Sequence, residues 1–265
     1  MKIAAAQIKC TLGDVDANLA KISDFASRAK GAGAELVVFP EMVDTGYSME
    51  QIRLHASAWS DRAVPRLRDL AQQLSVALIC GVSEREGGHI YNAQIVIDAR
   101  GEILAKYRKS HLFTPAPIEE HTCFSAGAEL VSCLLGDMRI GLSICYDLRF
   151  PEVYRSLVCD HEATVLAISS AWPFPRVEHL RVLTIARAIE NQSYLILSNR
   201  VGIDEGVIFC GSSAIIDPGG NVVACASSDR EELIYAELSN ETLQSIRSRM
   251  QVFADRRPEL YTRRT

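Results

Sequence analysis

Apolar residues recur along the chain in two spacings, which separate expected strands from expected helices. In segment 16–31, Leu19, Ile22 and Phe25 recur at helical spacing, and Gly31 provides a stop. Short apolar runs bounded by turn residues indicate strands. Helices are expected over residues 16–31, 64–74, 151–160, 178–191 and 241–251. Strands are expected over residues 2–8, 35–39, 77–82, 90–98, 102–108, 131–135, 138–144, 164–169, 194–199, 211–217, 222–226 and 233–237.

These elements alternate along the chain without a Pro-, Ser- or Gly-rich linker between them. Short turns at 99–101 and 136–137 are typical of hairpins. The mixture predicts one α/β domain spanning residues 1–265, with helices as the outer layers over large sheets. The Arg-rich segment 254–265 lacks a core pattern. We expect it to be disordered on its own unless it docks on a partner subunit.

Charge and hydropathy narrow the classes of partner. The formal net charge is -5 and no basic run occurs, which argues against nucleic acid or an anionic membrane as the main partner. The apolar start of the chain is interrupted by Gln7 and Lys9, which leaves too short a segment for an export signal. No stretch reaches the roughly 18 to 20 apolar residues of a membrane span. We therefore expect a soluble, cytoplasmic protein.

The chain has eight cysteines, none of them in a Cys-x-x-Cys pair, which disfavours zinc-ribbon and thioredoxin-type sites. Cys80 and Cys210 lie in apolar runs and are typical of small buried residues. In a reducing compartment we expect free thiols. The histidines also lack metal-ligand spacing, so no metal site is expected. A cysteine in this chain is therefore structural by default, and Cys145 needs reactive neighbours to be an exception.

Three reactive side chains follow expected strands. Glu41 comes after Leu-Val-Val-Phe-Pro, Lys109 after Leu-Ala-Lys-Tyr-Arg, and Cys145 after Gly-Leu-Ser-Ile. Ligands of open α/β sheets bind beyond the carboxyl ends of strands, so the three are expected to share one rim. A thiol with a pKa of about 8.5 needs a base or a cation to act as a nucleophile. A buried glutamate can take its proton, and a lysine can stabilise the thiolate and an oxyanion.

Three segments around these residues resemble the signature blocks of the nitrilase superfamily of carbon–nitrogen hydrolases. They are Phe-Pro-Glu at 39–41, Tyr-Arg-Lys-Ser-His-Leu-Phe at 107–113 and Cys-Tyr-Asp-Leu-Arg-Phe-Pro-Glu at 145–152. Further similar segments lie at 170–173, 187–192, 199–202 and 217–220. The resemblance covers nearly the whole chain, with the blocks in family order and at family-like spacing. It implies a four-layer α-β-β-α sandwich that assembles as a homodimer or higher homo-oligomer.

The resemblance also implies a role for each site residue. Cys145 would be the nucleophile, Glu41 the general base and Lys109 the stabiliser of the intermediate, with the backbone N–H of Tyr146 completing the oxyanion hole. A second glutamate assists in the family. Glu120 has the matching position relative to the following Phe-Ser-Ala-Gly segment, although the adjacent glutamate at position 119 leaves this assignment open. Neither a metal nor an organic cofactor is implied.

The residues after the nucleophile favour amides over nitriles. Cys-Tyr-Asp-Leu-Arg-Phe-Pro-Glu resembles the amidase branches, including the ω-amidase-like enzymes, whereas nitrilases more often carry a Trp-Glu-type sequence there. The resemblance thus predicts hydrolysis of a small-molecule amide through a cysteine thioester. Hydrolysis of N-carbamoyl amino acids or of nitriles, and acyl transfer to an amine, remain alternatives. A non-catalytic scaffold is disfavoured because all three reactive residues are present.

Four residues are candidates for binding substrate: Tyr47, Arg149, Trp172 and Arg176. Arg149 would suit the free carboxylate of a dicarboxylate monoamide, and the alternative is a structural ion pair with an acidic side chain such as the nearby Glu152. A Cys–His hydrolase is the rival mechanism, because a histidine at position 111 lies close to the expected lysine. A lone histidine in a strand-end loop is more often a scaffold residue.

Overall fold

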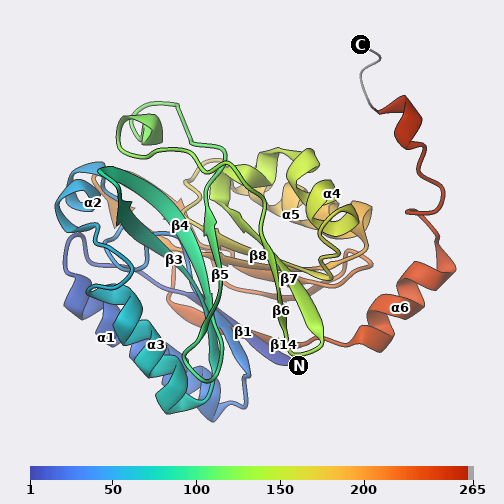
Figure 1. Cartoon of the computed structure of the whole chain (residues 1–265), viewed down its shortest axis with the longest axis horizontal. Helices are drawn as coiled ribbons and strands as arrows, with labels where there is room; N and C mark the ends of the chain where they lie inside the picture. The colour runs from blue at the N-terminus through green and yellow to red at the C-terminus, as the bar shows by residue number, and fades with distance from the viewer. Residues whose placement is uncertain (262–265) are drawn as a thin grey trace.

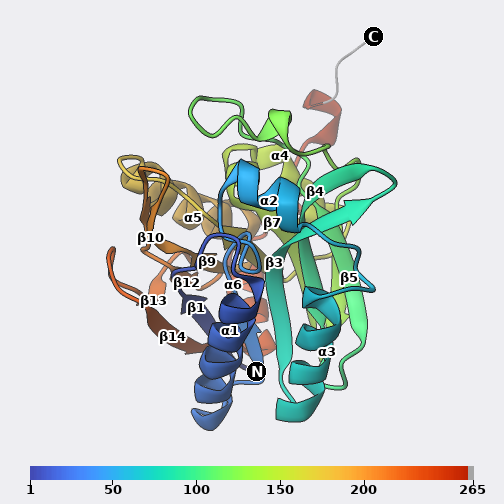
Figure 2. The ribbon, with the colours of Figure 1, turned by 90° about the vertical axis from the view of Figure 1, so that its left-hand side faces the viewer.

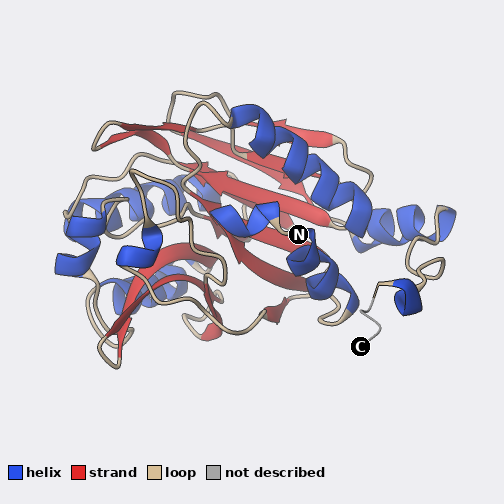
Figure 3. Cartoon of the chain, turned by 90° about the horizontal axis from the view of Figure 1, so that it is seen from above, coloured by secondary structure: helices blue, strands red, loops and turns tan. Residues whose placement is uncertain are grey.

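The computed structural model describes residues 1–261, which form two six-stranded sheets packed between layers of helices (Figures 1 and 3). The first sheet, in spatial order, consists of β14 (Glu232–Glu237), β1 (Lys2–Gln7), β2 (Leu36–Val38), β3 (Ala77–Glu86), β4 (His89–Ile97) and β5 (Ile103–Arg108). The second consists of β13 (Val222–Cys225), β12 (Ala214–Ile216), β9 (Tyr194–Asn199), β8 (Val165–Ser170), β7 (Met138–Ile144) and β6 (Ser132–Leu135).

Helices cover the outer face of each sheet, which confirms the predicted α-β-β-α sandwich. Helices α1 (Val15–Gly31) and α3 (Ala63–Leu74) lie side by side on the first sheet (Figure 2). Helices α4 (Pro151–Cys159) and α5 (Val177–Asn191) cover the second sheet (Figure 1). After β14, helix α6 (Asn240–Arg249) leads away from the body of the sandwich (Figure 1).

Two apolar clusters hold the layers together. Between the sheets, Val38 and Ile79 pack in one cluster with Ile140 and Leu142. A second cluster fills the space between the first sheet and its helices, where the apolar stripe of α1 is buried, including Ile22. Full burial of one such side chain stabilises the fold by about 1.5–3 kcal/mol. The stripe that predicted α1 is therefore the surface that attaches it to the sheet.

Strand direction brings the predicted site residues to one end of the sandwich. Strands β2 and β3 are parallel, and β3 and β5 are both antiparallel to β4, so β2 and β5 end at the same edge of the first sheet. Strands β7 and β8 are parallel and end together in the second sheet. The backbone N–H of Ala171, just after β8, donates to Glu41 Oε2 at 2.8 Å. The two edges therefore face each other.

One α-helix and one two-stranded hairpin were absent from the sequence prediction. Helix α2 (Met49–His55) has only seven residues, of which Ile52 alone is buried, so it has no repeating apolar stripe. The hairpin of β10 (Val201–Asp204) and β11 (Val207–Cys210) exposes Ile203 and Ile208, so its apolar residues do not mark a core face. The strand expected over 211–217 is correspondingly shorter, at Ala214–Ile216.

The C-terminal segment was expected to be an unstructured tail over 254–265. Residues 262–265 lie outside the described residues. Before them, η3 (Pro258–Leu260) forms one short 3-10 turn, and Leu260 and Tyr261 are exposed. Within residues 1–261, no helix combines the length and apolar character needed to cross a membrane.

Candidate active site

Cys145 is the first residue of a short 3-10 helix, η2 (Cys145–Arg149), which follows β7 without a break. Its φ is 42°, in the left-handed region that residues other than glycine rarely adopt. Such a conformation costs on the order of 1–3 kcal/mol and is typical of functional sites. The side chain is buried and lines a pocket. The first N–H groups of a helix have no partner within the helix, so the Tyr146 N–H is suited to hold an oxyanion.

The turn at the end of β7 is held by Asp147, whose carboxylate is fully buried. It accepts hydrogen bonds from the Ile144 N–H at 2.9 Å and the Tyr107 hydroxyl at 2.7 Å. The backbone N–H of His111 donates to it at 3.1 Å, and the His111 ring lies 2.9 Å away through Nδ1. The same ring stacks on Phe150 with centroids 3.8 Å apart. His111 is thus part of the scaffold beneath the turn.

Opposite this turn, two carboxylates share the same two donors. Lys109 Nζ lies 2.8 Å from Glu41 Oε1 and 2.8 Å from Glu120 Oε1. Asn92 Nδ2 donates to the same two oxygens, at 2.6 and 3.0 Å. All four side chains are buried, whereas Glu119 is exposed. The structure therefore places Glu120, and not its neighbour, beside the lysine.

The remaining hydrogen bonds distinguish the two carboxylates. Besides the two shared donors, Glu120 accepts from the Tyr47 hydroxyl at 2.6 Å and from the Phe113 N–H at 2.6 Å. Glu41 has only one further donor among residues 1–261, the Ala171 N–H on Oε2. A carboxylate offers about four lone-pair positions. Glu120 thus has four donors and Glu41 has three, so Glu41, through Oε2, is the less fully hydrogen-bonded acceptor for a proton delivered to this pair.

Burial and charge set the proton affinities of these groups. Burial raises the pKa of Glu41, Lys109 opposes this effect and Glu120 adds to it, with a net increase. Burial alone would lower the pKa of Lys109, but Glu120 and Glu41 outweigh it, so the amine stays charged. Burial and the charge of Glu41 raise the pKa of Cys145 well above its usual value, against the effect of Lys109. Cys145 is therefore a thiol at rest, beside a glutamate whose pKa is raised.

A glycine in the neighbouring strand makes room for the segment that carries Glu41. A Cβ at Gly81 would lie 2.6 Å from Glu41 Cα and 2.6 Å from the Pro40 carbonyl oxygen. Gly81 also exchanges hydrogen bonds with this segment, through the Pro40 carbonyl at 3.1 Å and the Val43 N–H at 2.7 Å. Sequence reasoning missed Gly81, because nothing in strand β3 indicates which loop will approach it.

All four residues expected to bind substrate line one pocket with the candidate nucleophile. The lining comprises Tyr47, Phe113, Ile118, Cys145, Tyr146, Arg149, Ala171, Trp172, Pro173 and Arg176. Its free volume is about 10 Å³, which is room for about one water molecule. Side chains at its mouth must therefore move when a substrate enters.

Two arginines stand at this pocket, each stacked on an aromatic ring. The Arg149 guanidinium lies 4.6 Å from the ring centre of Trp172, and that of Arg176 lies 5.3 Å from Phe113. Burial lowers the pKa of Arg149, and the charge of Arg176 lowers it further. Within the described part of the chain, neither arginine forms an ion pair with a carboxylate, and the alternative pairing with Glu152 is not formed.

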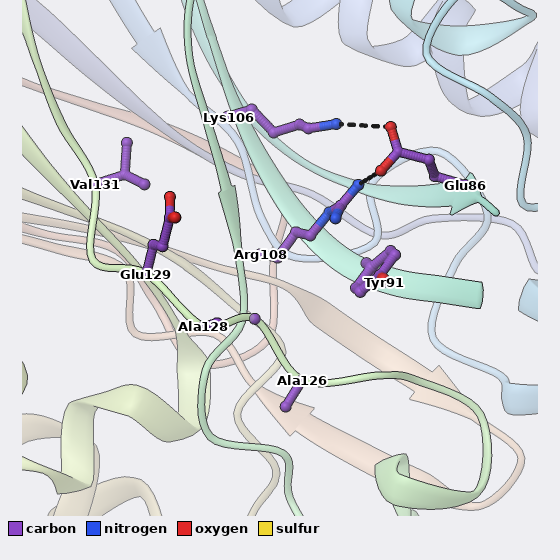
Figure 4. A pocket seen from close by; sticks show the side chains of 9 residues that line it. Glu86, Tyr91, Lys106, Arg108, Ala126, Ala128, Glu129 and Val131 are labelled. Atoms are coloured by element: carbon purple, nitrogen blue, oxygen red, sulfur yellow. Dashed lines mark hydrogen bonds and ion pairs between the residues drawn. The ribbon is translucent and has the colours of Figure 1, made fainter.

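A separate and wider groove of about 380 Å³ lies beside β5 (Figure 4). Lys106 and Arg108 both extend toward Glu86 in this groove, and Arg108 also bonds Glu84 at 2.6 Å and stacks on Tyr91. Its cations are thus neutralised by adjacent carboxylates, and no cysteine lines it. This groove is larger than the pocket at Cys145, but the reactive groups are in the smaller pocket.

Comparisons with known proteins identify the family of the chain. The carbon-nitrogen hydrolase family model matches residues 2–248. The chain is 35% identical to a 2-oxoglutaramate amidase of Bacillus subtilis over 98% of both chains. It is 33% identical to a nitrilase of Pyrococcus abyssi over 99% of this chain and 100% of that protein. An amidase from Nesterenkonia sp. AN1 has a similar structure, with a TM-score of 0.87 and 30% identity over 98% of both chains. In one of its variants, acrylamide has added to the active-site cysteine.

Proposed function

The chain belongs to the carbon-nitrogen hydrolase family, and from this premise we propose that it releases ammonia from the amide of a small carboxylic acid through a thioester on Cys145. The family and the amidase relatives make it a hydrolase of carbon–nitrogen bonds other than peptide bonds. The observation that carries the proposal is the buried ion-pair network of Glu41, Lys109 and Glu120, which acts on the pKa of the Cys145 thiol in a pocket.

In the first step, Cys145 Sγ attacks the amide carbon while its proton passes to Glu41. Oε2 of Glu41 is the receiving atom, because its other lone-pair positions are used. The raised pKa of Glu41 makes it a competent base for a thiol whose own pKa is raised. Transfer within the site leaves the total charge of the buried groups unchanged, which avoids burying a second unpaired anion.

The amide oxygen becomes an oxyanion during the attack. Lys109 has three N–H bonds, and two are directed at the glutamates, so the third is available for this oxygen together with the Tyr146 N–H. Collapse of the tetrahedral intermediate breaks the C–N bond, and ammonia leaves with the proton held by Glu41. A water molecule then attacks the thioester, with Glu41 again taking a proton, and the acid is released with the Cys145 thiol restored. No step requires a metal or an organic cofactor.

The pocket supports a substrate that carries a carboxylate at a distance from its amide. Arg149 and Arg176, both half-buried, present two cations without carboxylate partners among residues 1–261, and such cations favour an anionic ligand. Trp172 and Phe113 provide apolar contact beside them. We therefore propose an ω-amidase-like specificity for dicarboxylate monoamides such as 2-oxoglutaramate. Two of the relatives are named as amidases of this compound.

A substrate panel tests this function. Ammonia release is measured with 2-oxoglutaramate, succinamate, a neutral aliphatic amide, an N-carbamoyl amino acid and a nitrile, with Cys145→Ala as the control. We expect the dicarboxylate monoamides to have the highest kcat/KM and the control to show no turnover. Preference for the carbamoyl compound would reassign the substrate, and activity on the nitrile alone would contradict the amidase assignment.

We propose two further properties, an oligomeric state and a cellular location. A homodimer or higher homo-oligomer is supported by exposed apolar side chains on the outer face of α5, Val182 at 63% and Ile189 at 50%. A cytoplasmic location is supported by the eight free cysteines, which suit a reducing compartment. Sedimentation velocity tests the first property, and a monomer at micromolar concentration would contradict it.

A further inference from the structure

Asn92 is a fully buried polar residue in strand β4, a position that amides rarely occupy without a partner. Its backbone carbonyl accepts the Lys109 N–H at 2.8 Å, so it fixes the start of the segment that carries the lysine. Its side-chain Nδ2 donates to Glu41 Oε1 at 2.6 Å and to Glu120 Oε1 at 3.0 Å. Asn92 therefore contacts each charged member of the network.

The charges in this network do not balance. Glu41 and Glu120 carry two negative charges against one positive charge on Lys109, in a region that water does not reach. Such an excess favours uptake of a proton, and Glu41 has the vacant position for it. A resting enzyme with a protonated Glu41 would have no base for Cys145. A second donor is needed that holds the carboxylates in their ionised form.

A neutral amide meets this need. A second cation would hold Glu41 too firmly as a carboxylate to accept the thiol proton, whereas an amide N–H favours the ionised form more weakly. We propose that Asn92 is a positioning residue of the active site, which holds Glu41 and Glu120 together on Lys109 and keeps Glu41 free of a proton until Cys145 transfers one. The proposal rests on the proposed function where it is tested by ammonia release. Its second test, chemical modification of Cys145, does not depend on that function.

The competing explanation is that Asn92 only supports the sheet. Gln94 provides a matched control, since it lies two residues along the same strand and so on the same face. It is also a fully buried amide, but its Nε2 donates to Ser169 Oγ at 2.9 Å in the second sheet, away from the glutamates. Loss of Gln94 removes a buried amide and its packing without touching the network. A structural role predicts similar effects for the two residues.

The test compares wild type, Asn92→Ala, Asn92→Asp and Gln94→Ala. Two pH profiles are measured from pH 5 to 9: kcat/KM for ammonia release from succinamate, and the rate at which methyl methanethiosulfonate, a small reagent that reacts with thiolates and has no amide, modifies Cys145, followed by peptide mass spectrometry. A protonated Glu41 cannot take the Cys145 proton, so both rates should fall as the pH drops. Without the Asn92 donor, Glu41 keeps its proton up to a higher pH. The acidic limb of each profile, where the rate falls with decreasing pH, should therefore shift to higher pH. Asn92→Asp adds a third carboxylate and should move them further.

We expect Asn92→Ala to lose roughly 10- to 100-fold in kcat/KM at pH 7, the scale of one hydrogen bond to a charged group. Gln94→Ala should show the same acidic limbs as wild type in both pH profiles, even if its melting temperature is lower. If Asn92→Ala does not fold, Asn92→Ser takes its place with the same expected direction. Acidic limbs in the Asn92 variants that superimpose on those of wild type would overturn the proposal. If succinamate is not hydrolysed, the labelling profiles alone decide, and only the proposed function fails.

Discussion

Replacing Glu120 by glutamine removes one charge from the network at almost constant shape. Four donors converge on the Glu120 carboxylate: Lys109, Asn92 and Tyr47 on Oε1, and the Phe113 N–H on Oε2. Glutamine offers one acceptor oxygen and one NH₂ group. With its oxygen at the Oε1 position, the NH₂ group faces the Phe113 N–H; in the reverse orientation it faces the other three donors. Either way, donors oppose each other in a buried site.

The expected loss of stability follows from the number of donors left without an acceptor. One buried donor left without an acceptor costs about 1–3 kcal/mol. For a chain of this size, that lowers the melting temperature by roughly 2–12 °C. Lys109 loses one of its two carboxylate contacts, and small displacements of a catalytic group cost roughly 100-fold in rate. We therefore expect Glu120→Gln to fold, to melt earlier and to lose on the order of 100-fold in kcat/KM.

The pH profile gives a sharper test, because its direction is fixed by charge. Burial raises the pKa of Glu41 most, and the negative charge of Glu120 contributes to the increase. Removing that charge lowers the pKa of Glu41, so the acidic limb of kcat/KM should move to lower pH, opposite to the shift expected for Asn92→Ala. Glu119→Gln is the control, since this neighbour is exposed. An unmoved limb, or an equal loss of activity in the control, would refute the assignment of Glu120.

Other substitutions probe the turn, the pocket and the loop contact. Asp147→Asn should lower the free energy of unfolding by about 1–3 kcal/mol, measured in urea, because it turns a donor toward the Ile144 N–H; unchanged stability would contradict its anchoring role. Arg149→Met and Arg176→Met should each raise KM for succinamate by roughly 10-fold while leaving KM for a neutral amide unchanged. Gly81→Ala should destabilise the fold by about 1–3 kcal/mol, since its Cβ would clash with the Glu41 segment.

The strand ends were predictable because their signals are local. Apolar runs define β2, β5 and β7, and each is followed closely by Glu41, Lys109 or Cys145. The parallel direction of β2 and β3, and of β7 and β8, follows from the α/β alternation, and two hairpins return β5 to the same edge as β2. The sequence could not, however, decide between the two adjacent glutamates, because the choice depends on which side chain a 3-10 turn directs inward. In the structure the backbone at Glu119 has a φ of 47°, and Glu120 is buried.

The supporting residues were not predicted, because their contacts join distant parts of the chain. Asn92 and Glu41 are 51 residues apart, with Asn92 in β4 and Glu41 in the turn that follows β2. Asp147 was read only as part of a family block, although it anchors the turn through Tyr107, 40 residues away. One signal was available for Asn92: an amide within a mostly apolar strand indicates a buried polar partner.

The most direct test of the central claim is to identify the covalent intermediate. Wild-type protein is quenched in acid during turnover of succinamate, and its peptides are examined by mass spectrometry. The mechanism predicts an added mass equal to substrate minus ammonia on the peptide that contains Cys145, and neither adduct nor ammonia release in Cys145→Ala. Wild-type ammonia release by Cys145→Ala, or an acyl group on another cysteine, would contradict the assignment of Cys145 as the nucleophile.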